Sequence, residues 1–71
     1  MSDITEIGVV GAGSWGTALA ITANRAGSRV TLWSRSENVL DSIRTHRVNK
    51  VYLPDVFIDP QINVTDQLEH L

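Results

Sequence analysis

The sequence predicts an α/β fold: a β-α-β-α-β unit that forms the N-terminal half of a doubly wound parallel sheet. Two observations predict it. Short runs rich in apolar and β-branched residues alternate along the chain with segments whose apolar residues recur at helical spacing. Three closely spaced glycines also stand directly between the first such run and the first helical segment, where this kind of sheet places its main turn.

The first half of the chain supplies a strand, a helix and a second strand. Glu6–Val10 (EIGVV) is a short apolar run that ends at a glycine, as a buried parallel strand does. A helix is expected from Ser14, and Gly27 stands where a left-handed residue commonly ends one. Ser28–Trp33 (SRVTLW) is rich in β-branched and aromatic residues and predicts the second strand. The apolar residues at helical spacing are Trp15, Ala18, Leu19, Ala23 and Ala26.

A second helix is expected next. Ser36 is its candidate N-cap, and Glu37 places negative charge in the first turn, where the helix dipole favours it. One apolar stripe carries this helix to an end near His46. The basic residues within Ser42–Lys50 suit the negative end of the dipole, which favours a solvated helix end over a phosphate-steering patch. The stripe consists of Val39, Leu40 and Ile43.

The last part of the chain is less regular. Across residues 48–60, two prolines with scattered aspartates and asparagines indicate an irregular connection. Ile62–Thr65 (INVT) alternates apolar and polar residues and predicts a third strand. Thr65 or Asp66, with Glu69 following, predicts a third helix opened by a capping box.

The topology leaves part of this sheet without cover. Right-handed crossovers place both helices on one face of strands ordered 3-2-1. The other face and the outer edge of the first strand are then open, although parallel sheets are normally covered on both faces. A chain of this size also buries only about 60% of its unfolded surface. We therefore expect an N-terminal piece of a larger protein, or a chain that leans on a partner.

Gly11, Gly13 and Gly16 match the G-x-G-x-x-G pattern of dinucleotide-binding, Rossmann-type folds. The first glycine makes the tight turn, the second lets the backbone approach a pyrophosphate, and the third lets helix and strand pack closely. The free N–H groups around Ser14 to Gly16 then face the phosphates, aided by the helix dipole. Glycines that merely make a turn are the alternative. The flanking strands and helix favour dinucleotide binding, so residues 1–71 are expected to be a partial NAD(P)-binding domain.

Four side chains near this loop are further candidates. Ser14 either donates its hydroxyl to a phosphate oxygen or caps the helix. Trp15 either lies against the cofactor or packs into the core. After the second strand, where NAD-selective folds usually place an acid, the chain has Ser34 and Arg35. Their hydroxyl and guanidinium groups suit the 2′-phosphate of NADPH without excluding NADH, the alternative being a solvated arginine.

The composition limits other possibilities. A net charge of −2 gives no reason to expect nucleic acid, and a chain without cysteine has neither disulfides nor thiolate metal sites. The polar N-terminus is not a secretory signal and no apolar run has membrane-spanning length, so a cytoplasmic protein without a membrane partner is expected. His46 and His70 stand alone, so no metal site is expected. Asp55, Asp59 and Asp66 are interpreted as turn formers.

Four stretches resemble the N-terminal region of the bacterial NAD(P)-dependent glycerol-3-phosphate dehydrogenases. They are GAGSWGTALA (Gly11–Ala20), VTLWSR (Val30–Arg35), YLPD (Tyr52–Asp55) and the closing TDQLEHL. The resemblance spans essentially the whole chain. It implies NAD(P)H-dependent reduction of dihydroxyacetone phosphate to sn-glycerol 3-phosphate for phospholipid synthesis. It also implies a second, helical substrate domain and a homodimer.

The resemblance further implies which residues meet the cofactor, NADP or NAD. Tyr52 lies in a segment that approaches the cofactor side of the family's fold. No catalytic residue is expected here, because the family's catalytic lysines and phosphate-binding residues lie beyond Leu71 and Lys50 does not match them. The implied cofactor contacts are Gly11, Gly13, Ser14, Trp15, Gly16 and Arg35.

Two other functions remain open at this point. One is another NAD(P)-dependent reductase with a similar opening and a different substrate domain. The other is a non-catalytic dinucleotide-binding module.

Overall fold

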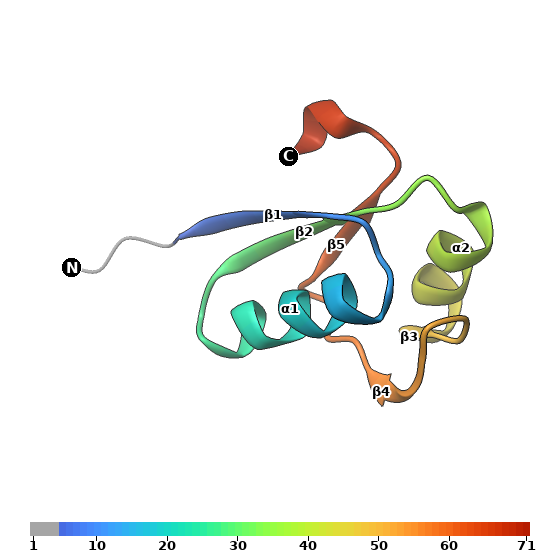
Figure 1. Cartoon of the computed structure of the whole chain (residues 1–71). Coiled ribbons are helices and arrows are strands. Elements are labelled where there is room, and N and C mark those ends of the chain that lie inside the picture. Colours follow the sequence, from blue (N-terminus) through green and yellow to red (C-terminus); the bar gives the residue numbers. More distant parts are fainter. Residues whose placement is uncertain (1–4) are drawn as a thin grey trace.

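The computed structural model describes residues 5–71, which form two small sheets and two helices (Figure 1). Helices and strands alternate through most of the chain, so the predicted α/β class is confirmed. In chain order the elements are β1 (Glu6–Val10), α1 (Ser14–Arg25), β2 (Arg29–Trp33), α2 (Glu37–His46), β3 (Val48–Asn49), β4 (Leu53–Phe57), β5 (Asn63–Thr65) and one 3₁₀ turn, η1 (Leu68–His70).

The larger sheet is parallel and has the strand order β1-β2-β5. Val9 of β1 lies opposite Leu32 of β2, which in turn lies opposite Val64 of β5. This is the predicted 3-2-1 order, and it confirms the N-terminal half of a doubly wound sheet. Within residues 5–71 no strand pairs with the outer side of β1, as predicted.

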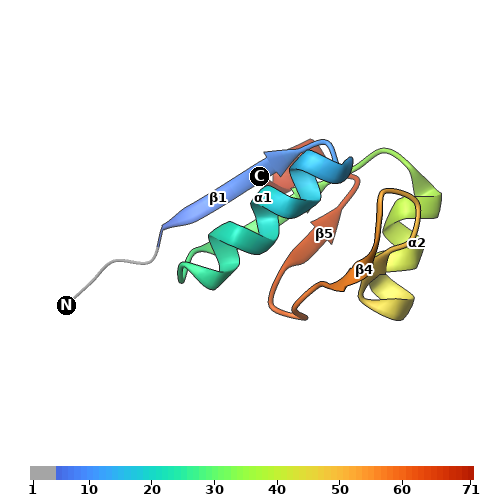
Figure 2. The ribbon, with the colours of Figure 1, turned by 60° about the horizontal axis from the view of Figure 1, so that its bottom comes forward.

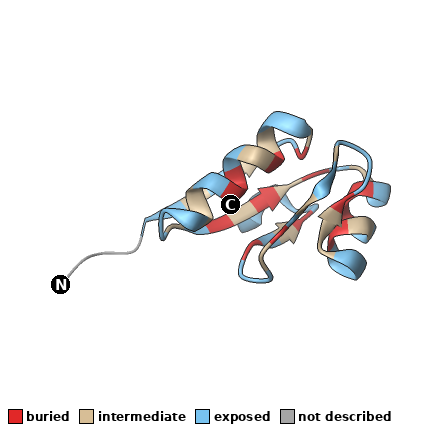
Figure 3. Cartoon of the chain, turned by 90° about the horizontal axis from the view of Figure 1, so that it is seen from below, coloured by how far each residue is buried: buried red, intermediate tan, exposed pale blue. Residues whose placement is uncertain are grey.

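The hydrophobic core lies on one face of this sheet, between the strands and the helices (Figure 3). Val30 and Leu32 of β2 belong to it, and α2 contributes Val39 and Ile43. Residues of both helices join the same cluster, so both helices cover the same face, as right-handed crossovers require. All three predicted stripe residues of α2 are buried. The other members of the cluster are Ala12, Ala20, Ile21, Ile58 and Ile62.

The apolar residues noted at helical spacing in α1 do not form a single buried face. Trp15 and Leu19 are 83% and 57% exposed, whereas Thr17, Ala20 and Ile21 are buried. Helical spacing alone does not say which of two stripes faces the sheet. At the start of α1, the glycine at position 16 packs against the carbonyl of Gly11, and Thr17, Ala20 and Ile21 follow it on the buried face.

The opposite face of the sheet is partly covered by the C-terminal turn, which lies above the strands in Figure 1. Leu71 packs on Gly8, since a Cβ built on that glycine would lie 3.2 Å from the Cβ of Leu71. Val10 nevertheless remains 62% exposed. Among the described residues, the predicted open face is therefore found over the carboxyl end of β1.

The ends of both helices follow the sequence predictions closely. The Ser36 hydroxyl accepts a hydrogen bond from the N–H of Val39 at 3.4 Å, so the predicted N-cap of α2 is confirmed. Gly27 follows α1 with a φ of 95°, a left-handed conformation that suits glycine. α2 ends at His46, and Arg47 takes the left-handed capping position with a φ of 54°.

Residues 48–60 were predicted to be irregular and instead contain an antiparallel hairpin, β3–β4 (Figure 2). β3 has only two residues, and the register shifts between Val48 and Asn49. β3 is thus too short to leave an alternating pattern in the sequence. β4 has five residues, but it contains Pro54 and its burial does not alternate. The hairpin lies on the helix side of the parallel sheet, next to the start of α1.

The side chain of Arg47 connects this region to the end of α2, a role that the sequence did not indicate. Its Nε donates to the carbonyl of Ile58 at 3.1 Å. Its Nη2 donates to the carbonyls of Asp59 and Ile62 at 2.6 and 2.8 Å. The arginine thus ties the end of α2 to the segment that leads into β5.

The predicted third helix is a single 3₁₀ turn, and the capping box does not form among residues 5–71. Thr65 stays in β5, and its Oγ1 accepts from the N–H of Gln67 at 3.0 Å. The same oxygen shares a hydrogen bond with Nδ1 of His70 at 2.8 Å. The hydroxyl therefore shapes a turn and does not start an α-helix.

Candidate functional site

The glycine loop lies at the carboxyl end of β1 and leads directly into α1 (Figure 2). The N–H of Gly11 donates to the carbonyl of Trp33 at 2.9 Å, which pins the loop to the end of β2. Ligands of open α/β sheets bind outside the carboxyl ends of the strands. The predicted loop therefore occupies the edge of the sheet where such a ligand is expected.

The three glycines are required for different reasons. Gly11 has a φ of 99°, which a residue with a side chain rarely adopts. A Cβ on Gly16 would overlap the carbonyl of Gly11, so this position needs glycine for close packing. Gly13 has an ordinary φ of −76°, and a Cβ there would meet no protein atom within 4 Å. The fold itself does not need a glycine at position 13, but a ligand lying against the loop would.

The start of α1 presents free hydrogen-bond donors. Gly13 is the N-cap residue, and no side chain caps the helix. Within residues 5–71, the backbone N–H groups of Gly13, Ser14, Trp15 and Gly16 donate to no other group. Together with the positive end of the helix dipole, such groups attract anions and phosphates.

A hollow of about 420 Å³ lies beside these amides. Residues 11–13 of the loop line one side, residues 33–36 at the end of β2 and just beyond it line another, and Tyr52 of the hairpin completes it. Of these lining residues, Arg35 alone is charged. The structure thus brings the glycine loop, Arg35 and the tyrosine segment together in one place, although they lie far apart in the sequence.

The two residues after β2 have different roles. Arg35 is exposed, and its guanidinium makes no hydrogen bond or ion pair among the described residues. Ser34 is only 6% exposed, and its Oγ accepts from the N–H of Ser36 at 3.1 Å. Ser34 therefore shapes the turn, and Arg35 is the residue that remains available to a phosphate.

For two residues in the first turn of α1, the structure excludes one of the two alternatives that the sequence left open. Ser14 does not cap the helix, because Gly13 occupies that position and the Ser14 hydroxyl donates to the carbonyl of Tyr52 at 2.8 Å. Trp15 does not pack into the core, because its side chain is 83% exposed. Contact of Ser14 and of Trp15 with a cofactor stays a prediction.

The sequence analysis missed one residue at this site. Asn49 of β3 is fully buried beneath the loop, and its side chain bonds to Ala12, Thr17 and Tyr52. An asparagine between a helix end and a proline indicates a turn, and nothing in the local sequence distinguishes a buried asparagine from one exposed in such a turn. The hydrogen bonds to a loop far away in the chain give it its role.

The remaining polar candidates lie outside this constellation. Lys50 is exposed and does not line the hollow. Across residues 5–71, no three His, Asp or Glu side chains are grouped so that they could hold a metal ion. In the same range, no helix combines the length and apolar character needed to cross a bilayer.

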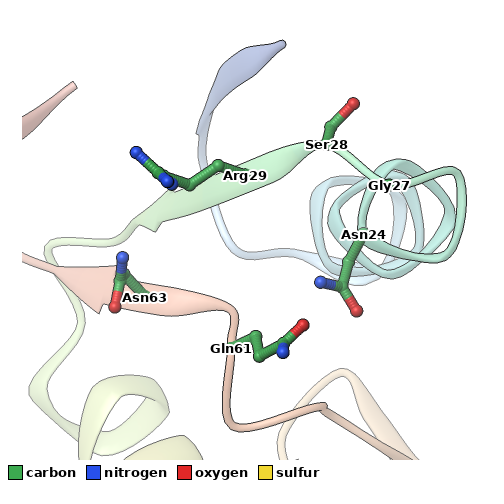
Figure 4. A pocket seen from close by; sticks show the side chains of 6 residues that line it. All are labelled: Asn24, Gly27, Ser28, Arg29, Gln61 and Asn63. Carbon is green, nitrogen blue, oxygen red and sulfur yellow. The ribbon is translucent and has the colours of Figure 1, made fainter. Parts of the chain in front are cut away.

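A second hollow, of about 380 Å³, lies at the opposite end of the strands (Figure 4). Asn24, Gln61 and Asn63 line it, together with the start of β2. Its only charged residue, Arg29, lies 3.4 Å from the carboxylate of Glu6. This end of a parallel sheet is not where open α/β folds bind their ligands.

The chain is similar to several known proteins. A family model described as "NAD-dependent glycerol-3-phosphate dehydrogenase N-terminus" matches residues 6–71. A glycerol-3-phosphate dehydrogenase (NAD(P)+) of Maricaulis maris is 48% identical over 71 residues, which is 100% of this chain and 21% of that protein. The corresponding protein of Zymomonas mobilis is 51% identical over 66 residues, 93% of this chain and 19% of the relative.

A solved structure is similar as well. The crystal structure of glycerol-3-phosphate dehydrogenase from Coxiella burnetii superposes with a TM-score of 0.85 at 36% identity. The similar region covers 94% of this chain and 21% of that one. The chain thus spans about a fifth of the length of the relatives it matches.

Proposed function

Because this chain belongs to the NAD-dependent glycerol-3-phosphate dehydrogenase family and matches its N-terminal region, we propose that it supplies the cofactor-binding part of such an enzyme. In this proposal residues 1–71 form part of an NAD(P)-binding domain. The observation that carries the proposal is Gly13, a glycine that the fold does not need, at the mouth of a loop with free amides. The family favours this function over another reductase or a non-catalytic module.

The residues at the hollow fit a dinucleotide phosphate. Its pyrophosphate would accept hydrogen bonds from the N–H groups of residues 13–16, which have no partner among the described residues. Arg35 would donate to the 2′-phosphate of NADPH, and no acidic residue lines the hollow to repel that phosphate. NADH would still bind through its pyrophosphate. Tyr52 lines the hollow, and Trp15 is exposed in the first turn of α1, so both rings are proposed to contact the cofactor.

The bound nicotinamide cofactor would supply the hydride chemistry of the reaction. The role of this chain is to bind and orient it. We assign no catalytic residue to residues 1–71, since Lys50, the only lysine, is exposed and away from the hollow. An acid that protonates the substrate oxygen would come from another part of the enzyme.

The reaction that we propose for the whole enzyme is reduction of dihydroxyacetone phosphate to sn-glycerol 3-phosphate, a precursor of phospholipids. Its partners would be this small phosphate substrate and a second copy of the enzyme, with a helical domain holding the substrate. We propose the cytoplasm as its location, consistent with a chain that contains no cysteine. Nucleic acid and membranes are not proposed partners.

Binding and turnover of the full-length protein test the proposal. Calorimetry with NADPH, NADH and ADP-ribose should show that all three bind, and Gly13→Val should abolish binding while Asn63→Asp, at the far end of the strands, should not. Oxidation of NADPH should depend on dihydroxyacetone phosphate and not on ketoacids. Binding that is unaffected by Gly13→Val, or turnover of a ketoacid alone, would contradict the proposal.

A further inference from the structure

We propose that Asn49 is a positioning residue of this site: it holds the glycine loop so that the N–H of Gly13 faces the cofactor pyrophosphate. The inference rests on the proposed cofactor binding and extends it to a residue that does not line the hollow. Asn49 lies on β3 and is fully buried. It therefore acts through the loop and not on the ligand.

Both the nitrogen and the oxygen of the Asn49 side-chain amide make hydrogen bonds. Its Nδ2 donates to the carbonyl of Ala12 at 2.8 Å and to Oγ1 of Thr17 at 3.0 Å. Its Oδ1 accepts from the N–H of Tyr52 at 3.2 Å. A backbone carbonyl can only accept and an N–H can only donate, so only one orientation of the amide satisfies these partners. One side chain thus joins the loop, the first turn of α1 and the hairpin.

The bond to Ala12 sets the direction of the next amide. In a planar trans peptide, the carbonyl of Ala12 and the N–H of Gly13 point in opposite directions. Asn49 holds that carbonyl on the buried side, so the N–H of Gly13 is directed away from the protein interior. This N–H has no partner within residues 5–71, and Gly13 lines the hollow. The donor is therefore fixed before a phosphate arrives.

A second contact supports the same arrangement. The hydroxyl of Ser14 donates to the carbonyl of Tyr52, which belongs to the same short segment as Asn49. The hairpin thus holds both sides of Gly13, one through Ala12 and the other through Ser14. Donors that are already in place cost little reorganisation when the ligand binds, and this raises affinity.

The test compares a ligand that reaches the loop with one that does not. ADP-ribose carries the pyrophosphate, whereas adenosine 2′-monophosphate carries only the phosphate that Arg35 is proposed to bind. Asn49→Asp keeps the shape and the acceptor toward Tyr52 but removes the donors to Ala12. Asn49→Ala removes the amide without adding charge. Asn63→Asp is the matched control, because Asn63 is exposed at the other end of the strands.

Calorimetry on the full-length protein should show that both Asn49 variants bind ADP-ribose at least about tenfold more weakly, as expected for one lost hydrogen bond to a charged group. The affinity of the Asn49 variants for adenosine 2′-monophosphate should stay within about twofold of that of the unsubstituted protein. The control variant should keep its affinity for both ligands within the same range. The KM for NADPH should rise with kcat nearly unchanged, because the pyrophosphate contact is equal in ground and transition states.

Three other outcomes would overturn the inference. An equal loss of affinity for both ligands in the Asn49 variants would mean that Asn49 only stabilises the fold. Unchanged ADP-ribose binding in Asn49→Ala would mean that the loop keeps its direction without the amide. If the unsubstituted protein bound neither ligand, the proposed function would fail and this inference with it. In the first two cases the proposed function would stand.

Discussion

Gly13→Ala should separate ligand binding from folding. At this position φ is −76° and a Cβ would meet no protein atom within 4 Å, so alanine fits without strain. The helix loses a slightly better N-cap residue, which costs at most about 1 kcal/mol of unfolding free energy. The new methyl group lies where we propose that the pyrophosphate approaches the amides. Loss of one or two hydrogen bonds to a charged group, about 1.5–3 kcal/mol each, raises Kd at least tenfold.

Gly16→Ala is the matched comparison, because it makes the same chemical change three positions along the chain. There the Cβ would overlap the backbone carbonyl of Gly11, so α1 must shift away from the loop. Overpacking of this kind costs about 1–3 kcal/mol. Urea denaturation and ADP-ribose calorimetry on the full-length protein measure both effects. If Gly13→Ala left the Kd within twofold of the original value, the assignment of the loop would be refuted.

Three further predictions concern residues around the site. In calorimetry, Arg35→Ala should weaken the binding of NADPH at least about tenfold and that of NADH by less than about threefold, since only NADPH carries the 2′-phosphate. An equal effect on both cofactors would contradict the proposed contact between Arg35 and that phosphate. Arg47→Lys should lower the unfolding free energy, measured in urea, by about 1–3 kcal/mol, because the ammonium group of a lysine does not match the three carbonyls that the guanidinium bonds. An unchanged denaturation midpoint would show that water replaces these hydrogen bonds. Ser36→Ala should cost about 0.5–2 kcal/mol through the lost cap of α2, whereas Ser36→Asp should keep that stability; equal stability of all three proteins would argue against the cap.

The glycine loop and Arg35 could be predicted because their signals are local. A strand, three spaced glycines and a helix occur consecutively in the chain, and Arg35 is the second residue after the next strand. The parallel order of the strands follows from the same alternation and from the handedness of crossovers. These features need no knowledge of contacts between distant residues.

Asn49 and Arg47 could not be predicted, because distant partners define their roles. Asn49 bonds to a carbonyl 37 positions away, and Arg47 bonds to three carbonyls 11 to 15 positions further along. Both residues are polar and stand among turn-forming neighbours, so local patterns indicate solvent exposure. Apolar spacing alone also did not identify the buried face of α1, where Thr17, Ala20 and Ile21 are buried. Trp15 and Leu19, which share the apolar spacing, are exposed.

A crystal structure of the full-length protein with NADPH bound tests the central claim most directly. The account predicts pyrophosphate oxygens within about 3 Å of the backbone nitrogens of residues 13–16, with the guanidinium of Arg35 at the 2′-phosphate. A cofactor seated instead in the hollow near Asn24 and Asn63, or one whose pyrophosphate made no bond to these amides, would contradict it.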